Sequence, residues 1–249
     1  MSETDLKVFP GLGYYKLLKW DTQFFRYPIA LLRLVYADEE CLIKFLEQMR
    51  TRDVKLIYCI VEPDYFFGNT LLREKGVLLV DEKVTYAKEV SKEKDITICP
   101  EIISYSSAHV NDKLKSLVLQ SGIYSRFNMD KKFNAGEFER LYLKWIENSV
   151  KRKIARDLLV YNVDGVEVGL VTLGIKNGRG DIGLLVVDGN YRGRAIGRKL
   201  AEAAIGKFIQ WNITEAQVVT QKRNKIACEF YESIGFSIEK IENYYHIWL

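Results

Sequence analysis

Three apolar runs in the second half of the chain are separated by two tight-turn dipeptides, and this arrangement strongly constrains the fold. The runs cover residues 157–163, 166–175 and 181–187, and they are rich in valine, leucine and isoleucine. Asp164-Gly165 joins the first two runs, and Asn177-Gly178 precedes the third. Both dipeptides favour two-residue hairpin turns, because their residues readily adopt positive φ angles. The pattern therefore predicts three neighbouring antiparallel strands.

Helical and extended segments alternate through the rest of the chain. Apolar residues three and four positions apart predict helices, and short apolar runs predict strands. The helices are predicted at 38–49, 65–75, 108–121, 137–153 and 194–211, and the other strands at 29–36, 54–61, 76–80 and 216–220. The charged segment 90–100 ends at a proline, which favours a boundary near residue 95. We therefore expect a smaller α/β domain over 1–95 and a second domain over 96–249.

Composition excludes several classes of protein. Among 249 residues, Lys plus Arg is 37 and Asp plus Glu is 33, so the net charge of +4 is too small to indicate nucleic-acid binding. The four cysteines form no C-x-x-C pair and lie near no histidine at ligand spacing, so we expect neither a metal site nor a disulfide framework. The first residues lack the basic-then-apolar pattern of a signal peptide, and no apolar run approaches the ~20 residues that span a bilayer. We expect a soluble cytoplasmic protein.

Nine of the 17 glycines lie between Gly165 and Gly197, and two segments there are candidates for phosphate binding. Residues 178–183 match G-x-G-x-x-G, but they open a strand, whereas a dinucleotide fingerprint opens a helix. Residues 191–197 follow a strand and open a helix, where unpaired N–H groups and nearby arginines attract anions. From the residues alone, an ordinary strand–turn–helix with a basic start is an equal alternative.

Two motifs resemble those of the GCN5-related N-acetyltransferase (GNAT) superfamily. Arg192 and Gly197 take the first and last positions of the acyl-CoA motif R/Q-x-x-G-x-G/A, and Ala195 stands where glycine is usual. Residues 224–236 are similar to the motif N-x-x-A-x-x-x-Y-x-x-x-G-F. Over residues 97–249, the resemblance implies an α/β (α+β) fold with a mixed, mostly antiparallel sheet flanked by helices. It also implies acetyl-CoA as cosubstrate, without a metal.

The resemblance further implies residue roles. In this superfamily the fourth and fifth strands splay apart, often at a bulge, and the exposed backbone holds pantetheine. The implied cofactor-binding residues are Leu185, Val186, Val187, Arg192, Gly193, Arg194, Ala195, Ile196, Gly197, Asn224, Ala227 and Tyr231. Tyr231 is the implied general acid, with a core aromatic as the alternative, and Asn224 orients cofactor or tyrosine. No base is apparent: Asp181 and Asp188 flank the fourth strand but also suit turns, and a water relay needs neither.

A narrower resemblance concerns the front of the chain. Residues 20–25 (W-D-T-Q-F-F), residues 27–30 and Ser125-Arg126-Phe127 look like segments of the dTDP-fucosamine acetyltransferase group. That group acetylates the 4-amino group of a dTDP-4-amino-4,6-dideoxyhexose. The resemblance implies acceptor contacts from Trp20, Phe24, Phe25 and Arg126, and a homodimer. The alternatives are a core role for the aromatic stretch, another amine acceptor such as a peptide, polyamine or aminoglycoside, and a non-catalytic acyl-CoA sensor.

Overall fold

The chain forms two compact units, one of residues Met1–Lys83 with Ile241–Leu249 and the other of Val84–Lys240. The computed structural model describes residues 6–36, 38–65, 67, 76–91 and 99–249. The strands β5 (Val77–Glu89) and β11 (Ser237–Trp248) each contribute to both units. The predicted boundary near residue 95 lies outside the described residues, as does most of the helix predicted over 65–75. The observed division instead falls inside β5 and returns the C-terminal residues to the first unit.

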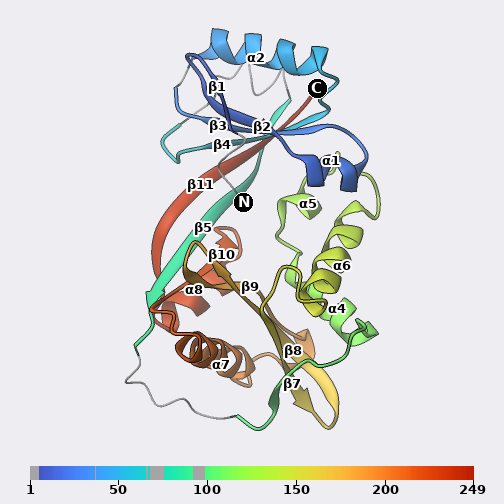
Figure 1. Ribbon diagram of the computed structural model, residues 1–249, viewed down its shortest axis with the longest axis vertical. Coiled ribbons are helices and arrows are strands. Elements are labelled where there is room, and N and C mark those ends of the chain that lie inside the picture. Colours follow the sequence, from blue (N-terminus) through green and yellow to red (C-terminus); the bar gives the residue numbers. More distant parts are fainter. Residues whose placement is uncertain (1–5, 37, 66, 68–75, 92–98) are drawn as a thin grey trace. The chain divides into compact units, whose positions relative to one another are not determined.

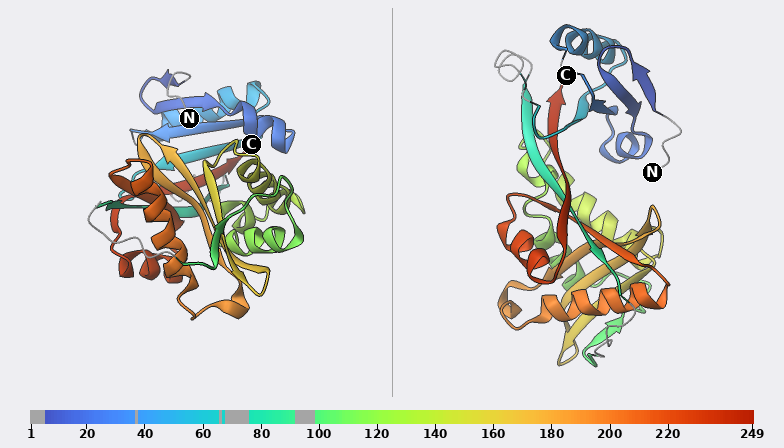
Figure 2. Two further views of the ribbon diagram at one scale, coloured as in Figure 1. Left: turned by 60° about the horizontal axis from the view of Figure 1, so that its bottom comes forward. Right: turned by 90° about the vertical axis from the view of Figure 1, so that its left-hand side faces the viewer.

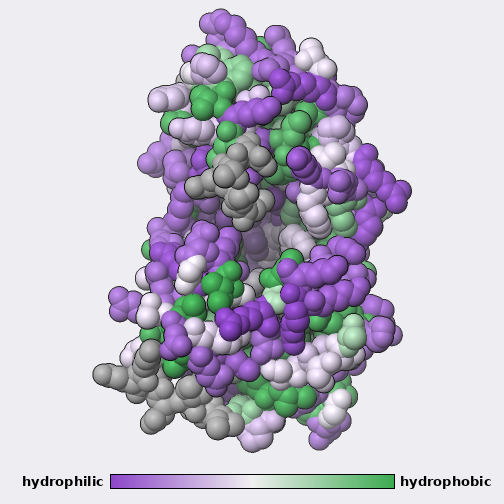
Figure 3. Space-filling model, viewed as in Figure 1, coloured by the Kyte–Doolittle hydropathy of each residue, from purple (hydrophilic) through white to green (hydrophobic). Residues whose placement is uncertain are grey.

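In its described residues, the first unit contains a sheet with strand order β1-β2-β3-β4-β11 and the helices α1 and α2. Its strands before β11 are β1 (Lys7–Phe9), β2 (Gly13–Leu17), β3 (Ile29–Leu34) and β4 (Leu56–Val61). The helix α2 (Glu39–Thr51) connects the parallel strands β3 and β4. Its predicted apolar stripe (Leu42, Phe45, Leu46 and Met49) is buried against the sheet. Its opposite face is polar, as the upper edge of the space-filling view shows (Figure 3).

The aromatic stretch at residues 20–25 forms the helix α1 (Lys19–Phe25) of the first unit. Phe25 is buried, whereas Trp20 is 44% exposed. The Trp20 ring stacks on Phe24, with centroids 5.1 Å apart and planes inclined by 7°. Phe25 therefore has the core role given as the alternative, whereas acceptor contacts from this stretch stay a prediction.

The second unit contains a sheet with strand order β5-β10-β9-β8-β7-β6 (Figures 1 and 2). The strands are β6 (Ile102–Ser104), β7 (Asp157–Val163), β8 (Val166–Lys176), β9 (Arg179–Val187) and β10 (Glu215–Gln221). Neighbours from β6 to β9 pair antiparallel, and β9 pairs parallel with β10. The dipeptides 164–165 and 177–178 have φ angles of 50°, 80° and 54°, 81°. The predicted hairpins are thereby confirmed, because positive φ at both positions characterises the type I′ turn.

Helices cover both faces of this sheet. α4 (Asp112–Ser121) and α6 (Glu137–Val150) pack on the face that carries Leu158, Val160 and Leu170. α7 (Ile196–Gln210) packs on the other face, where a side chain at Gly169 or Gly180 would meet its Leu200 or Phe208. The shorter helices are α5 (Arg126–Met129), inside a segment predicted as a loop, and α8 (Lys225–Ser233). Layers of this kind match the predicted α/β fold with a mixed, mostly antiparallel sheet.

Candidate active site

Strands β9 and β10 diverge at a bulge. Their parallel register runs from Gly180 opposite Ala216 to Ile182 opposite Val218. Beyond this point the pairing of β9 with β8 shifts register, because Thr172 alone stands opposite two residues of β9. The hydroxyl of Thr172 accepts a hydrogen bond from the Leu184 N–H at 2.8 Å. Past the bulge, the register with β10 does not include residues 185–187, which leaves this edge of β9 for another extended chain.

Glycine at position 183 allows the bulge to form. A Cβ atom at this position would lie 2.8 Å from the Thr172 Oγ1 atom, too close for a real contact. The same oxygen holds the Leu184 N–H, so it has no freedom to move away without losing that hydrogen bond. The predicted divergence of the fourth and fifth strands of this domain is therefore confirmed, and its local cause is the Gly183–Thr172 contact.

The loop after β9 leads into α7 through two residues with positive φ. Gly193 has φ of 76°, and Ala195, the N-cap residue of α7, has φ of 57°. Left-handed geometry costs a non-glycine residue roughly 1–2 kcal/mol, which explains why a motif of this shape favours glycine at the fourth position. Ala195 adopts the left-handed conformation nonetheless, so the loop has the backbone conformation that favours glycine at this position. The first turn of α7 presents unpaired N–H groups and a partial positive charge.

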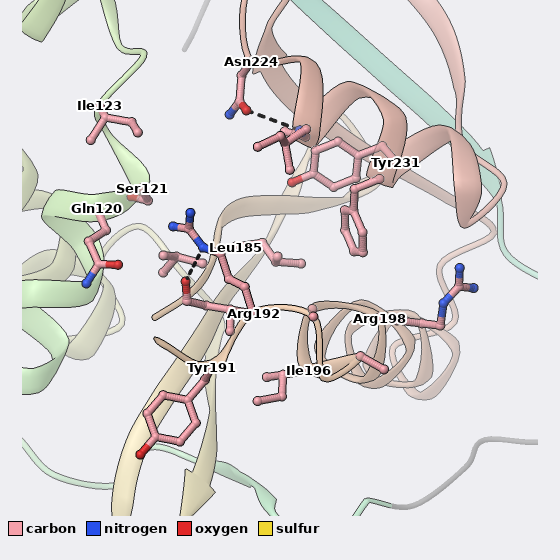
Figure 4. Close-up of a pocket in the computed structure, with 18 of the residues that line it drawn as sticks. Gln120, Ser121, Ile123, Leu185, Tyr191, Arg192, Ile196, Arg198, Asn224 and Tyr231 are labelled. Carbon is pink, nitrogen blue, oxygen red and sulfur yellow. Dashed lines mark hydrogen bonds between the residues drawn. The ribbon is translucent and has the colours of Figure 1, made fainter. Parts of the chain in front are cut away.

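A cavity of about 440 Å³ lies between β9, the start of α7, α8 and the end of α4 (Figure 4). Eleven of the predicted site residues line it: Leu185, Val186, Val187, Arg192, Gly193, Ala195, Ile196, Gly197, Asn224, Ala227 and Tyr231. Arg194 does not line it, since its guanidinium lies over the Tyr191 ring, 5.0 Å from the centroid. Arg126 is also outside the lining, and Trp20, Phe24 and Phe25 belong to the first unit.

Tyr231 and Asn224 reach the cavity from α8. The Tyr231 ring packs against Phe230, Phe236 and Tyr86, with centroids 5.3, 5.9 and 5.9 Å away. Figure 4 shows its hydroxyl directed toward the space between α8 and β9. Burial raises the pKa of this hydroxyl well above 10, so the phenol is protonated at neutral pH. The ring is thus packed as a core aromatic, and its protonated hydroxyl faces the cavity.

The helix α8 is held at both ends. At its start, the Asn224 Oδ1 atom accepts from the Ala227 N–H at 3.3 Å and caps the helix. Near its end, the Tyr86 hydroxyl on β5 donates to Glu232 Oε1 at 2.8 Å. Lys88, two residues further along β5, donates to the carbonyl of Ile234. These contacts set where the Tyr231 side chain stands relative to the cavity.

The cavity is also lined by residues outside the set of implied site residues. The additional lining residues are Gln120, Ser121, Ile123, Tyr124, Tyr191, Arg198, Ile226 and Phe230. Ile226 and Phe230 lie inside the recognised motif 224–236, and Tyr191 and Arg198 flank the loop. Gln120 and its neighbours at the end of α4 carry no motif. Their link to the site is tertiary, since Gln120 Oε1 accepts from the Gly189 N–H at 3.2 Å.

The two aspartates that flank β9 have structural partners. Asp181 accepts from Gln217 Nε2 at 2.6 Å, and Asp188 accepts from the Asn190 N–H at 2.9 Å and caps a short 3-10 turn. Neither lines the cavity. Over the described ranges, no three His, Cys, Asp or Glu residues are grouped so that they could hold a metal. Within those same ranges, every helix is too short or too polar to cross a membrane.

The sequence is similar to a family of acetyltransferases over the part of the chain that forms most of the cavity. Residues 123–236 match the model of the acetyltransferase (GNAT) family. N-alpha-acetyltransferase 30 of Saccharomyces cerevisiae is 38% identical over 68 residues, which cover 27% of this chain and 39% of the relative. The protein of the same name from Homo sapiens is 37% identical over 62 residues, covering 25% and 17%. The chain thus matches about two fifths or less of these relatives' lengths.

Solved structures share the fold at low sequence identity. A functionally unknown conserved protein from Staphylococcus epidermidis superposes with a TM-score of 0.63 at 14% identity, covering 98% of this chain and 94% of that one. A GCN5-related N-acetyltransferase from Sphaerobacter thermophilus gives 0.57 at 15% identity, covering 94% and 76%. The chain therefore has the fold of the GCN5-related N-acetyltransferases. The part of the chain that matches the acetyltransferase (GNAT) family model, residues 123–236, contains most of the residues that line the cavity.

Proposed function

We propose that this chain is an N-acetyltransferase that transfers acetyl from acetyl-CoA to a primary amine by direct attack on the thioester. One observation carries the proposal. A single cavity is lined by the unpaired edge of β9, by the loop that begins α7 and by Tyr231. These parts supply, in one space, a main-chain edge for an extended arm, an anion site for a diphosphate and a proton donor for a leaving thiolate.

The residues present fit the donor. The backbone of Leu185, Val186 and Val187 pairs with the amides of the pantetheine arm as a neighbouring strand would. The N–H groups of the loop at 193–197 and the first turn of α7 receive the diphosphate. Ala227 and Asn224 line the side of the cavity formed by α8. When bound, acetyl-CoA supplies an activated acyl group as a thioester.

The chain's own residues assist the transfer in three ways. A main-chain N–H among residues 185–187 polarises the thioester carbonyl as negative charge develops on its oxygen. The new carbon–nitrogen bond forms as the carbon–sulfur bond breaks, and Tyr231 donates its proton to the departing sulfur. The Asn224 Oδ1 atom caps α8, and its amide group orients the ligand or Tyr231. The amine releases its proton to water, because Asp181 and Asp188 are engaged elsewhere.

For the acceptor we propose the 4-amino group of a dTDP-4-amino-4,6-dideoxyhexose. The support is the front motif together with its geometry, since Trp20 and Phe24 form a stacked aromatic pair with an exposed face. Arg126 is the proposed partner of the acceptor diphosphate. The second candidate acceptor is the α-amine of a peptide, which is favoured by the similarity to proteins named N-alpha-acetyltransferase 30.

Release of free thiol from acetyl-CoA tests the proposal. The chain is assayed against dTDP-4-amino sugars, peptides with free N-termini and polyamines, with mass spectrometry of the product. We expect Tyr231→Phe to lower kcat by about 10²–10⁴-fold, with little change in the KM for acetyl-CoA. Tyr36→Phe is the matched control, because that side chain is 61% exposed in the first unit. Absence of thiol release with every amine, or an unchanged kcat in Tyr231→Phe, would contradict the proposal.

A further inference from the structure

The helix α8 carries Tyr231 but has little packing of its own to hold it. It spans nine residues, all of them described, and Tyr231 is the one that is buried. Isolated helices shorter than about 12–15 residues are marginal in water, so a helix of this length takes its position from tertiary contacts. The Asn224 cap fixes only its start. Contacts further along the helix therefore decide how far it can turn about its axis.

Tyr86 of β5 supplies such contacts through both parts of its side chain. Tyr86 is 1% exposed, and its ring lies 5.9 Å from the Tyr231 ring, with planes inclined by 42°. Its hydroxyl donates to Glu232 Oε1 at 2.8 Å. The Cys228 thiol, one turn before Glu232 on the same face of α8, also interacts with this hydroxyl. One side chain therefore packs against Tyr231 and ties down the helical turn that carries it.

The Tyr86 hydroxyl stays a hydrogen-bond donor throughout the neutral range. Burial, and then the bond to Glu232, raise the pKa of Tyr86 well above the ordinary tyrosine value. Tyr86 does not line the cavity, whereas Tyr231 does. Any influence of Tyr86 on a bound ligand therefore passes through α8.

We infer that Tyr86 is a positioning residue for the reaction, because its bond to Glu232 fixes the rotation of α8 and holds the Tyr231 hydroxyl in place for proton donation. The inference rests on the proposed function, since it concerns the same proton donor. The outer atoms of a helix lie about 5–6 Å from its axis, so a rotation of about 10° displaces them by about 1 Å. A misplacement of that size can lower a rate by as much as about 10²-fold.

Tyr86→Phe tests the bond, because it removes the hydroxyl and keeps the ring. We expect kcat to fall by about 10- to 100-fold, with little change in the KM for acetyl-CoA. Tyr105→Phe is the matched control. Tyr105 is 8% exposed, donates to the His109 carbonyl at 2.7 Å and does not line the cavity. The control should lower the urea midpoint to a similar degree and leave kcat unchanged.

The partner residue offers a conservative rescue. Glu232→Gln keeps an oxygen that accepts from the Tyr86 hydroxyl, so it should retain most of kcat. Glu232→Leu has no acceptor and should lower kcat as Tyr86→Phe does. Because both changes break one bond, the double variant Tyr86→Phe with Glu232→Leu should be no slower than the slower single variant.

Combination with Tyr231→Phe separates positioning from general destabilisation. If Tyr86 acts through the Tyr231 hydroxyl, Tyr86→Phe should lower kcat no further in the Tyr231→Phe background, measured by thiol release at high enzyme concentration. The inference is overturned if Tyr86→Phe, folded by circular dichroism, keeps its kcat, if it lowers kcat equally in that background, or if Tyr105→Phe loses as much. Those outcomes leave the proposed function intact, whereas absence of thiol release from the unsubstituted chain with every amine overturns the function itself.

Discussion

The bulge in β9 depends on the hydroxyl of Thr172. Removing that hydroxyl tests how the edge of β9 at residues 185–187 becomes available for acetyl-CoA. Thr172 Oγ1 accepts from the Leu184 N–H at 2.8 Å, at the point where the β8–β9 register shifts. Thr172→Val replaces this oxygen with a methyl group of similar shape. The Leu184 N–H then loses its acceptor in a partly buried position, at a cost of about 1–3 kcal/mol in the free energy of unfolding.

The same substitution should weaken donor binding. If the bulge relaxes, residues 185–187 lose the spacing that presents their backbone to an extended arm. A change of about 1.4 kcal/mol in binding free energy corresponds to a tenfold rise in the KM for acetyl-CoA. We expect a rise of about this size, measured by thiol release, together with a lower urea midpoint for the second unit. Thr172→Ser keeps the oxygen and is the matched control.

A clear result would refute this reasoning. If Thr172→Val unfolds at the same urea concentration as the unsubstituted chain and has the same KM for acetyl-CoA, the hydroxyl does not support the bulge. If Thr172→Ser, which keeps the oxygen, loses as much stability and raises the KM as much as Thr172→Val, the hydrogen bond alone does not support the bulge.

Two further predictions concern packing and proton donation. Gly180→Ala should lower the free energy of unfolding by about 1–3 kcal/mol, because its Cβ would lie 2.6 Å from the Phe208 ring. Gly174→Ala, whose Cβ would meet its nearest atom at an ordinary 3.6 Å, should be close to neutral in the same denaturant titration. For Tyr231, burial raises the pKa, so the proton donor is present throughout the neutral and mildly alkaline range. The kcat should therefore show no loss from Tyr231 ionisation between pH 7 and about 10; a decline in that range that Tyr231→Phe abolishes would contradict the assignment.

Much of the fold was predictable because local signals and tertiary structure agree. The dipeptides 164–165 and 177–178 require positive φ and form the expected hairpins. The apolar stripe of α2 is buried as its spacing predicts. The one-turn helix α5 escaped prediction, because four residues are too few to show helical periodicity. The grouping of Ile241–Leu249 with the first unit has no local signal, because these residues lie at the far end of the sequence from the rest of that unit.

The site divides in the same way. The loop at 192–197 and the motif at 224–236 are each continuous in sequence. Eleven predicted residues, drawn from these two segments and from β9, line one cavity. Arg194 was predicted with them, yet the loop geometry turns its side chain onto Tyr191. Side-chain direction within a loop depends on each φ and ψ angle, which residue spacing does not report. Gln120 reached the site through a hydrogen bond to Gly189, across 69 residues of chain.

The sequence by itself predicted the class of fold, which the structure confirms, and through its resemblance to a family it also predicted a donor loop at 192–197 and a proton-donating tyrosine. It did so because turn dipeptides, glycine-dependent loops and helix starts act over a few neighbouring residues. Only the tertiary structure decided that Thr172 opens β9, that β5 anchors α8, and that Gln120 of α4 reaches the loop after β9. Those features depend on contacts between strands and helices distant in sequence, and such contacts exist only once the chain has folded.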